Sequence, residues 1–416
     1  MIASKEDDDN HETEKVKTKK TKLKTEDVIY SFGPALFLER ICAIYRFRIL
    51  DGTLMPTSNL MKVYGLVIAI AIAGIFLFYF DIPDVLSKTE PLKDATEDFP
   101  AIVILIQYST SAVMTSCLLS RSNIRIMNSL ANIDSSLRLN TNEEFYRKSR
   151  RHSVKALCLV VGIHIVSSAS DYFLRIEEES PIINDMLNYI LNSVQDLEIL
   201  VFYLMISMLN DRLKVINNDL TKILHYKDNQ GKISVYTIRQ KNSKNEKPLD
   251  IHGKMAVNNL RDLSLAYDTI GEACHLINSV YNYQIFMTLI SAFVYIVITL
   301  WTALFYYRTQ VYTGNLVPII LWCCSEMLTV AAMAFVCEMF LSTRSETKVL
   351  VNELVMEYAR PTRTRAQAKA FMRLIDSWPL RVYVYDMFTV DITLMLKFIS
   401  VSTTYLIVII QISHFV

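Results

Sequence analysis

The apolar residues of this chain are gathered in long blocks, with polar and charged connections between them. Seven blocks are long enough for helices that cross a bilayer, which takes about 20 apolar residues. They are Val63–Phe80, Ala101–Leu119, Val154–Phe173, a stretch within Ile183–Leu209, Ile285–Tyr307, Leu316–Phe340 and Leu394–Ile412. The pattern predicts an all-α membrane protein with seven transmembrane helices.

The last block carries a stripe of polar residues. Lys397, Ser400, Thr404 and Gln411 recur at helical spacings, which at about 100° per residue places them within a wedge of about 60°. Transmembrane helices turn polar side chains toward a bundle interior or a water-filled path, although serine and threonine also allow close helix packing. Because Lys397 and Gln411 share the stripe, we expect this helix to face a water-filled path. The alternative for Lys397 is snorkelling to the membrane interface.

Helical patterns continue into two of the polar connections. Apolar residues recur with helical spacing over Met255–Tyr283, leading into the fifth span, and over Val349–Ile375, with a break near Pro361. Such apolar faces need partners, so we expect a separate helical layer. The predicted organisation is a disordered cytoplasmic tail (1–27), a cytoplasmic or interfacial segment (28–62), spans one to four (63–209), a cytoplasmic linker and helix (210–284), spans five and six (285–340), cytoplasmic anchor helices (341–393) and the pore helix (394–416).

Lysine and arginine are concentrated in alternate connections. The connections after the second, fourth and sixth spans are rich in both residues, whereas those between them contain few. Short loops rich in lysine and arginine stay in the cytoplasm. The distribution therefore predicts a cytoplasmic N-terminus and an extracellular C-terminus, the opposite of a G-protein-coupled receptor. No proline lies in the interior of a predicted span, which also separates the chain from that class.

Composition narrows the possible chemistry. Hydrophobic residues make up 52% of the 416, and the formal net charge is +1, so no nucleic-acid partner is expected. None of the seven cysteines lies in a predicted external segment, and their spacing matches no zinc motif. The histidines are scattered without an HExxH pattern, and no glycine-rich phosphate loop is present. We therefore expect no metal, no cofactor and no enzymatic activity.

Two short motifs near the C-terminus carry a resemblance. Thr404-Tyr405 is followed by five apolar residues and Gln411, and Phe388-Thr389-Val390-Asp391 precedes the last helix. Both resemble the closing signature of insect gustatory receptors. The chain departs from that pattern at Asp386 and Met387, where the family often has a small residue, and at Ile412, where phenylalanine is frequent.

The resemblance implies a ligand-gated, nonselective cation channel built as a homo- or heterotetramer in the plasma membrane. In that family the seventh helices surround the pore, and the motif glutamine lies near the outer constriction. Intracellular helices form a central anchor. The pore and gate residues expected here are Gln411, Ile412, Val408 and Thr404. A ring of side-chain amides from several subunits can coordinate hydrated ions, and a ring of apolar side chains can close a pore by dewetting.

The family also binds its ligand among the outer halves of spans two to six. Aromatic side chains with a few directed polar groups suit a small organic molecule, here a sugar or a bitter compound. Intramembrane acids are functional candidates. The alternative for the aromatic residues from Trp301 to Tyr307 is an interfacial belt. The candidate ligand-binding residues are Gln107, Tyr108, Asp171, Asn192, Gln195, Asp196, Trp301, Trp322 and Glu326.

Three functions are therefore weighed. The first is a tastant-gated cation channel of the plasma membrane. The second is a metabotropic seven-span receptor that signals through cytoplasmic partners docked on its long basic loops. The third is a secondary transporter, against which the sequence shows no inverted repeat and no pair of glycine- or proline-broken helices in matching positions.

Overall fold

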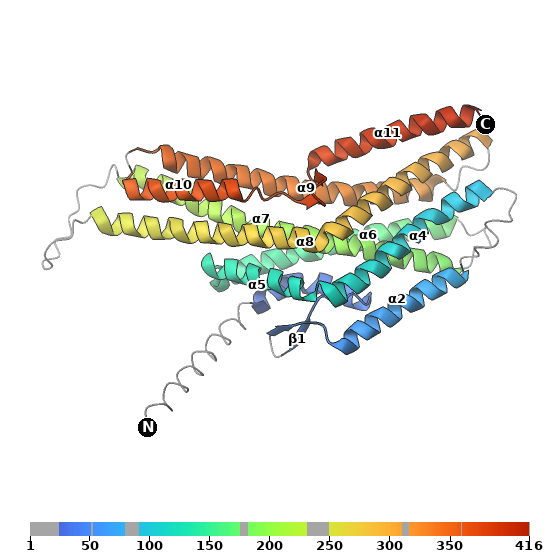
Figure 1. Ribbon diagram of the computed structural model, residues 1–416, viewed down its shortest axis with the longest axis horizontal. Helices are drawn as coiled ribbons and strands as arrows, with labels where there is room; N and C mark the ends of the chain where they lie inside the picture. Colours follow the sequence, from blue (N-terminus) through green and yellow to red (C-terminus); the bar gives the residue numbers. More distant parts are fainter. Residues whose placement is uncertain are drawn as a thin grey trace, which may run out of the picture.

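The computed structural model describes residues 25–50, 53–79, 91–174, 182–230, 249–309, 316–358 and 360–415. Its helices form an elongated bundle, to which two short antiparallel hairpins are added (Figure 1). In chain order the elements are a helix over residues 25–41, β1 (Arg48–Leu50), β2 (Thr53–Met55), α2 (Asn59–Tyr79), α4 (Pro91–Val113), α5 (Ser120–Ser136), α6 (Glu143–Leu174), α7 (Ile182–Gln230), α8 (Leu249–Thr309), α9 (Leu316–Met356), α10 (Thr362–Ser377), β3 (Tyr383–Val384), β4 (Phe388–Thr389) and α11 (Ile392–Phe415).

Each of the seven predicted spans lies on a helix, namely α2, α4 with the π-helical turn Met114–Leu118, α6, α7, α8, α9 and α11. Among the described residues, five helices are long and apolar enough to cross a membrane: Asn59–Phe78, Pro100–Leu118, Glu143–Ser170, Asn259–Trp301 and Ile320–Met356. The other two are α7 and α11. In α7 the apolar stretch contains Gln195, Asp196 and Glu198. In α11 several side chains lie outside the described residues. Phe80, at the end of the first predicted span, lies outside the described residues.

Three helices are much longer than a bilayer is thick. With 49, 61 and 41 residues and a rise of 1.5 Å per residue, α7, α8 and α9 extend over about 74, 92 and 62 Å. The hydrocarbon core measures only about 30 Å. At the end of the bundle away from the C-terminus, these helices lie beside α5 and α10 (Figure 1). This layer is packed around fully buried Leu213, Ile216, Tyr267, Ile270 and Phe371, which belong to the same core as buried residues of the spans such as Ile285 and Val330.

The two patterned connections become parts of this layer. Met255–Tyr283 lies wholly within α8, which continues without a break into the fifth span. α9 ends at Met356, and α10 begins at Thr362 with Pro361 immediately before it. Proline is well suited to that place because its missing N–H would be unpaired at a helix start anyway.

The N-terminal segment is packed into the bundle. Val28 and Phe32 of its helix are fully buried in the main core. Arg46 donates to both carboxylate oxygens of Glu39 at 2.6 and 2.7 Å, and the pair is buried. The Arg46 guanidinium also lies 5.1 Å from the centre of the Tyr281 ring on α8. The ion pair thus allows this charged segment to pack inside the protein.

The connection from α10 to α11 is fixed against α8. The β3–β4 hairpin is held by two asparagines one turn apart, because Asn278 and Asn282 accept the backbone N–H groups of Tyr383 and Tyr385 at 3.0 and 2.8 Å. Just before the hairpin, the Trp378 indole donates to Asp268 at 2.7 Å. Through these contacts the start of α11 is tied to the longest helix of the bundle.

Candidate functional site

Asp196 joins three helices in the middle of the bundle. Its carboxylate lies 2.8 Å from Nε2 of His164 on α6 and accepts a hydrogen bond of 2.8 Å from the Thr329 hydroxyl on α9. All three belong to predicted spans, and the Asp196 and His164 side chains are buried. A carboxylate in such a place costs free energy unless donors surround it, so these two contacts fix α6 and α9 against α7.

The neighbouring residue Gln195 points to a different set of partners. Its side-chain nitrogen donates to Glu326 of α9 at 3.3 Å, and its oxygen accepts from the Ser291 hydroxyl of α8 at 3.4 Å. All three side chains are buried. Successive residues of a helix lie about 100° apart. Gln195 therefore reaches α8 and α9, whereas Asp196 reaches α6 and α9.

Aromatic rings lie one to two helical turns from these acids. Trp322, four residues before Glu326 on α9, stacks on Tyr189 of α7 with ring centres 5.9 Å apart and planes within 8°. The His164 ring is 5.8 Å from Trp322 on another side. The predicted residues Gln195, Asp196, Trp322 and Glu326 are therefore brought together in one buried cluster, which we call the α6–α9 polar cluster. It also contains His164, Ser291 and Thr329.

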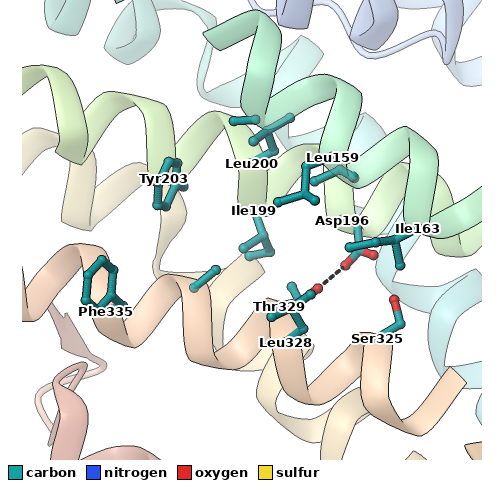
Figure 2. A pocket seen from close by; sticks show the side chains of 13 residues that line it. Leu159, Ile163, Asp196, Ile199, Leu200, Tyr203, Ser325, Leu328, Thr329 and Phe335 are labelled. Carbon is teal, nitrogen blue, oxygen red and sulfur yellow. Dashed lines mark hydrogen bonds between the residues drawn. The ribbon is translucent and has the colours of Figure 1, made fainter. Parts of the chain in front are cut away.

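A cavity of about 210 Å³ opens beside Asp196, between α6, α7 and α9. Figure 2 shows the Asp196–Thr329 hydrogen bond at one end of it and mostly aliphatic and aromatic side chains around it. Its polar lining consists mainly of Asp196, Ser325 and Thr329, and the remainder includes Leu159, Ile163, Ile199, Leu200, Leu328 and Phe335. An apolar space with a few convergent polar groups is the usual form of a small-molecule site.

The other predicted ligand residues lie outside this cluster. Gln107 of α4 donates to Thr288 of α8 at 3.1 Å, one turn from Ser291. Tyr108 packs in a second core with its hydroxyl 3.4 Å from the carbonyl oxygen of Cys42. Asn192 is buried and donates to the carbonyl oxygen of Asn188 within α7. Trp301 is partly buried near the end of α8, and the side chain of Asp171 lies outside the described residues.

The predicted pore helix packs by one face only. α11 contacts α8 and α9, and Phe293 of α8 lies edge-on to both Phe398 and Tyr405, with ring centres 6.3 and 5.2 Å apart. The residues of the predicted polar stripe are all exposed: Lys397, Ser400, Thr404 and Gln411, together with Val408. The side chain of Ile412 lies outside the described residues. α11 therefore has an uncovered face that combines polar and apolar residues.

Asp391 forms the start of α11. Its carboxylate accepts the backbone N–H groups of Thr393 and Leu394 at 3.0 and 3.2 Å, together with the hydroxyl groups of Thr389 and Thr393. Partial burial raises the pKa of this carboxyl group, but these four donors outweigh it and hold the pKa below its usual value. The carboxylate therefore caps the helix in its ionised form.

Comparison with known families identifies the chain. The sequence profile described as 7tm chemosensory receptor matches residues 35–414. The chain belongs to this chemosensory receptor family. No curated protein matches it. The resemblance noted in the sequence is thus confirmed at the level of the receptor family.

Solved structures agree with the fold of this receptor. It is similar to the insect olfactory receptor OR5 from Machilis hrabei, with 12% identity, a TM-score of 0.63, and 92% of this chain and 97% of that chain covered. It is equally similar to the same protein in complex with eugenol, with 13% identity, a TM-score of 0.64 and the same coverage. At this identity the likeness establishes the fold, which is that of a multi-pass seven-transmembrane chemosensory receptor.

Three residues of the polar cluster in this receptor were not singled out by sequence reasoning. Ser291 and Thr329 look like ordinary packing residues of apolar helices, since small hydroxyl side chains are common there. His164 lies within the third predicted span and matches no motif. An ionisable residue within a span is a functional candidate, so His164 could have been selected on that ground. The sequence does not show that its partner is Asp196.

Proposed function

We propose that this receptor is a tastant-gated, nonselective cation channel of the plasma membrane, assembled as a tetramer with α11 of each subunit around the pore. The observation that carries the proposal is the uncovered face of α11. A helix with Lys397, Thr404 and Gln411 exposed on one side requires either water or further protein there, because lipid does not solvate such polar groups well. Symmetric association of several subunits provides both.

Gustatory function is the finer part of the proposal. It rests on the motif of Thr404-Tyr405, five apolar residues and Gln411, and on Phe388-Thr389-Val390-Asp391 before it. Val390 is buried in the core and Asp391 caps α11, so the second motif serves to position the pore helix. The gate would be formed by Gln411 and Ile412, with Val408 and Thr404 below them.

A ligand bound at the α6–α9 polar cluster has a direct mechanical route to α11. Ser291 and Glu326 of the cluster belong to α8 and α9, the two helices on which α11 packs. α8 also holds the β3–β4 hairpin through Asn278 and Asn282. A ligand that shifts α8 against α9 would therefore move the start of α11 as well, provided that it binds the two arrangements with different affinity.

Patch-clamp recording from cells that express the receptor tests the proposal. The cells are perfused with sugars and bitter compounds while G-protein signalling is blocked, and Gln411→Ala is compared with Gln367→Ala on α10. We expect a rapid cation current whose relative ion permeabilities change with Gln411→Ala and remain unchanged with Gln367→Ala. Responses that disappear when G proteins are blocked would instead establish the metabotropic alternative. Silence despite surface expression calls for co-expression with a related subunit.

A further inference from the structure

The α6–α9 polar cluster has an excess of hydrogen-bond acceptors and of acidic side chains. Asp196 and Glu326 are both buried, and within the described part of the chain neither forms an ion pair with a lysine or arginine. Among the residues described, their one basic neighbour is His164, which contacts Asp196. Two carboxyl groups thus share at most one positive charge. Buried carboxylates are costly without a cation or several donors beside them, so the cluster is complementary to a cation.

Two further acceptor atoms, one in the cluster and one beside it, are buried without a partner in the described structure. Because a carboxylate only accepts, the Nε2 atom of His164 carries the proton shared with Asp196, which leaves Nδ1 of a neutral ring as an acceptor. The Oδ1 atom of Asn192 is the second. His164 and Asn192 are 7% and 5% exposed, and Asn192 lies one turn from Asp196 on the same face of α7. What the cluster lacks is therefore a group that donates hydrogen bonds.

The surroundings narrow the ligand further. Trp322 lies one turn from Glu326 with Tyr189 stacked on one face of its indole, and an indole face attracts cations. On the other side of Asp196 lies the cavity of about 210 Å³ with its largely apolar lining (Figure 2). A polyol would find few partners for several hydroxyl groups in such a space. A small molecule with an apolar body and a single cationic donor fits both parts.

We infer that the receptor recognises small lipophilic amines in their protonated form. The hydrocarbon part occupies the cavity between α6, α7 and α9, and the ammonium group lies at Asp196 and Glu326. This inference rests on the proposed ligand site and goes beyond it by naming the chemical class of the ligand. Leu159, Leu328 and Phe335, which line the cavity, are exposed on the surface of the bundle, so an amine of this kind has a route through the lipid.

The test compares 2-phenylethylamine with 2-phenylethanol, which has the same carbon skeleton and a neutral hydroxyl group. Binding is measured at pH 7 as the rise in the thermal unfolding midpoint of the full-length receptor in lipid nanodiscs. We expect the amine to act at concentrations at least about tenfold lower than the alcohol, since a hydrogen bond to a charged group contributes about 1.5–3 kcal/mol.

Variants locate the preference. Asp196→Asn and Glu326→Gln should each lower the ratio of the effective concentrations of the two compounds toward one. The control is Asp219→Asn, which should leave the ratio unchanged, because Asp219 lies on α7 like Asp196 but pairs with Lys222. Two variants are used so that misfolding of one does not remove the test. Equal action of the two compounds on the native receptor, no effect of the amine, or a preference that survives in both variants would overturn the inference.

The measurement is independent of channel activity. Amine binding without any ligand-evoked current would support this inference and count against the proposed channel function. Conversely, a current evoked by neutral tastants, with no preferential binding of the amine, would support the channel and reject the amine as its ligand class.

Discussion

Gly271 of α8 lies directly against the indole of Trp378, which makes it a sensitive position of the layer formed by α8, α9 and α10. A Cβ atom added there would lie 2.5 Å from Cγ and Cδ2 of Trp378 and 2.8 Å from Cδ1. The indole cannot easily move away. Its Nε1 donates to Asp268 at 2.7 Å, and the Trp378 carbonyl oxygen accepts from the Tyr267 hydroxyl at 3.1 Å.

The expected magnitude for Gly271→Ala is the balance of opposing contributions to the free energy of unfolding. Alanine in a helix stabilises by about 0.5–1 kcal/mol relative to glycine. Overpacking costs about 1–3 kcal/mol, and losing the hydrogen bond to the Asp268 carboxylate costs about 1.5–3 kcal/mol if the ring is displaced. Because a contact of 2.5 Å forces the ring to move, we expect a net destabilisation of roughly 1.5–5.5 kcal/mol, since packing and hydrogen bonding outweigh helix propensity here.

The assay is thermal unfolding of the purified receptor, with Gly162→Ala as the matched control because nothing lies within 4 Å of a Cβ atom at Gly162. Gly271→Ala should lower the midpoint by several degrees and Gly162→Ala should not. In a Trp378→Leu background, Gly271→Ala should cost much less, since the aromatic ring is absent. An unchanged midpoint for Gly271→Ala, or the same fall in both backgrounds, would refute the reasoning.

Three other predictions follow from the same structure. A tag at the C-terminus should be accessible to antibody on intact cells; accessibility only after permeabilisation would contradict the orientation inferred from lysine and arginine. Removing both hairpin contacts with Asn278→Ala and Asn282→Ala should shift the ligand concentration for half-maximal current at unchanged surface expression, because the hairpin before α11 is then no longer bound to α8; an unchanged dose–response curve would show that the hairpin does not couple them. The lowered pKa of Asp391 means that its carboxylate stabilises the fold above the usual carboxyl pKa of about 4 and loses this contribution as the pH falls through its folded pKa. The unfolding midpoint should therefore differ most between the native receptor and Asp391→Asn near neutral pH, and a difference that grows on acidification would argue against the cap.

The sequence by itself determined the elements of this receptor. The long apolar blocks predicted the positions of the seven helices that contain the spans. Each helix must meet the length and composition that a bilayer requires by itself. Helical spacing of apolar residues over Met255–Tyr283 and the proline at Pro361 located the extension of α8 and the break between α9 and α10. The motif ending in Gln411 pointed to the receptor family that the profile match then established.

Only the tertiary structure decided which residues meet. Gln195 and Asp196 are adjacent in the sequence, yet their side chains reach different partners, and His164 joined the cluster only because α6 crosses α7 at Asp196. The close approach of Trp378 to Gly271 and the clamp of Asn278 and Asn282 on the hairpin likewise join residues more than a hundred positions apart. Periodicity reports which face of a helix is polar or apolar. It does not report which helix lies opposite, because that depends on the packing of the whole bundle.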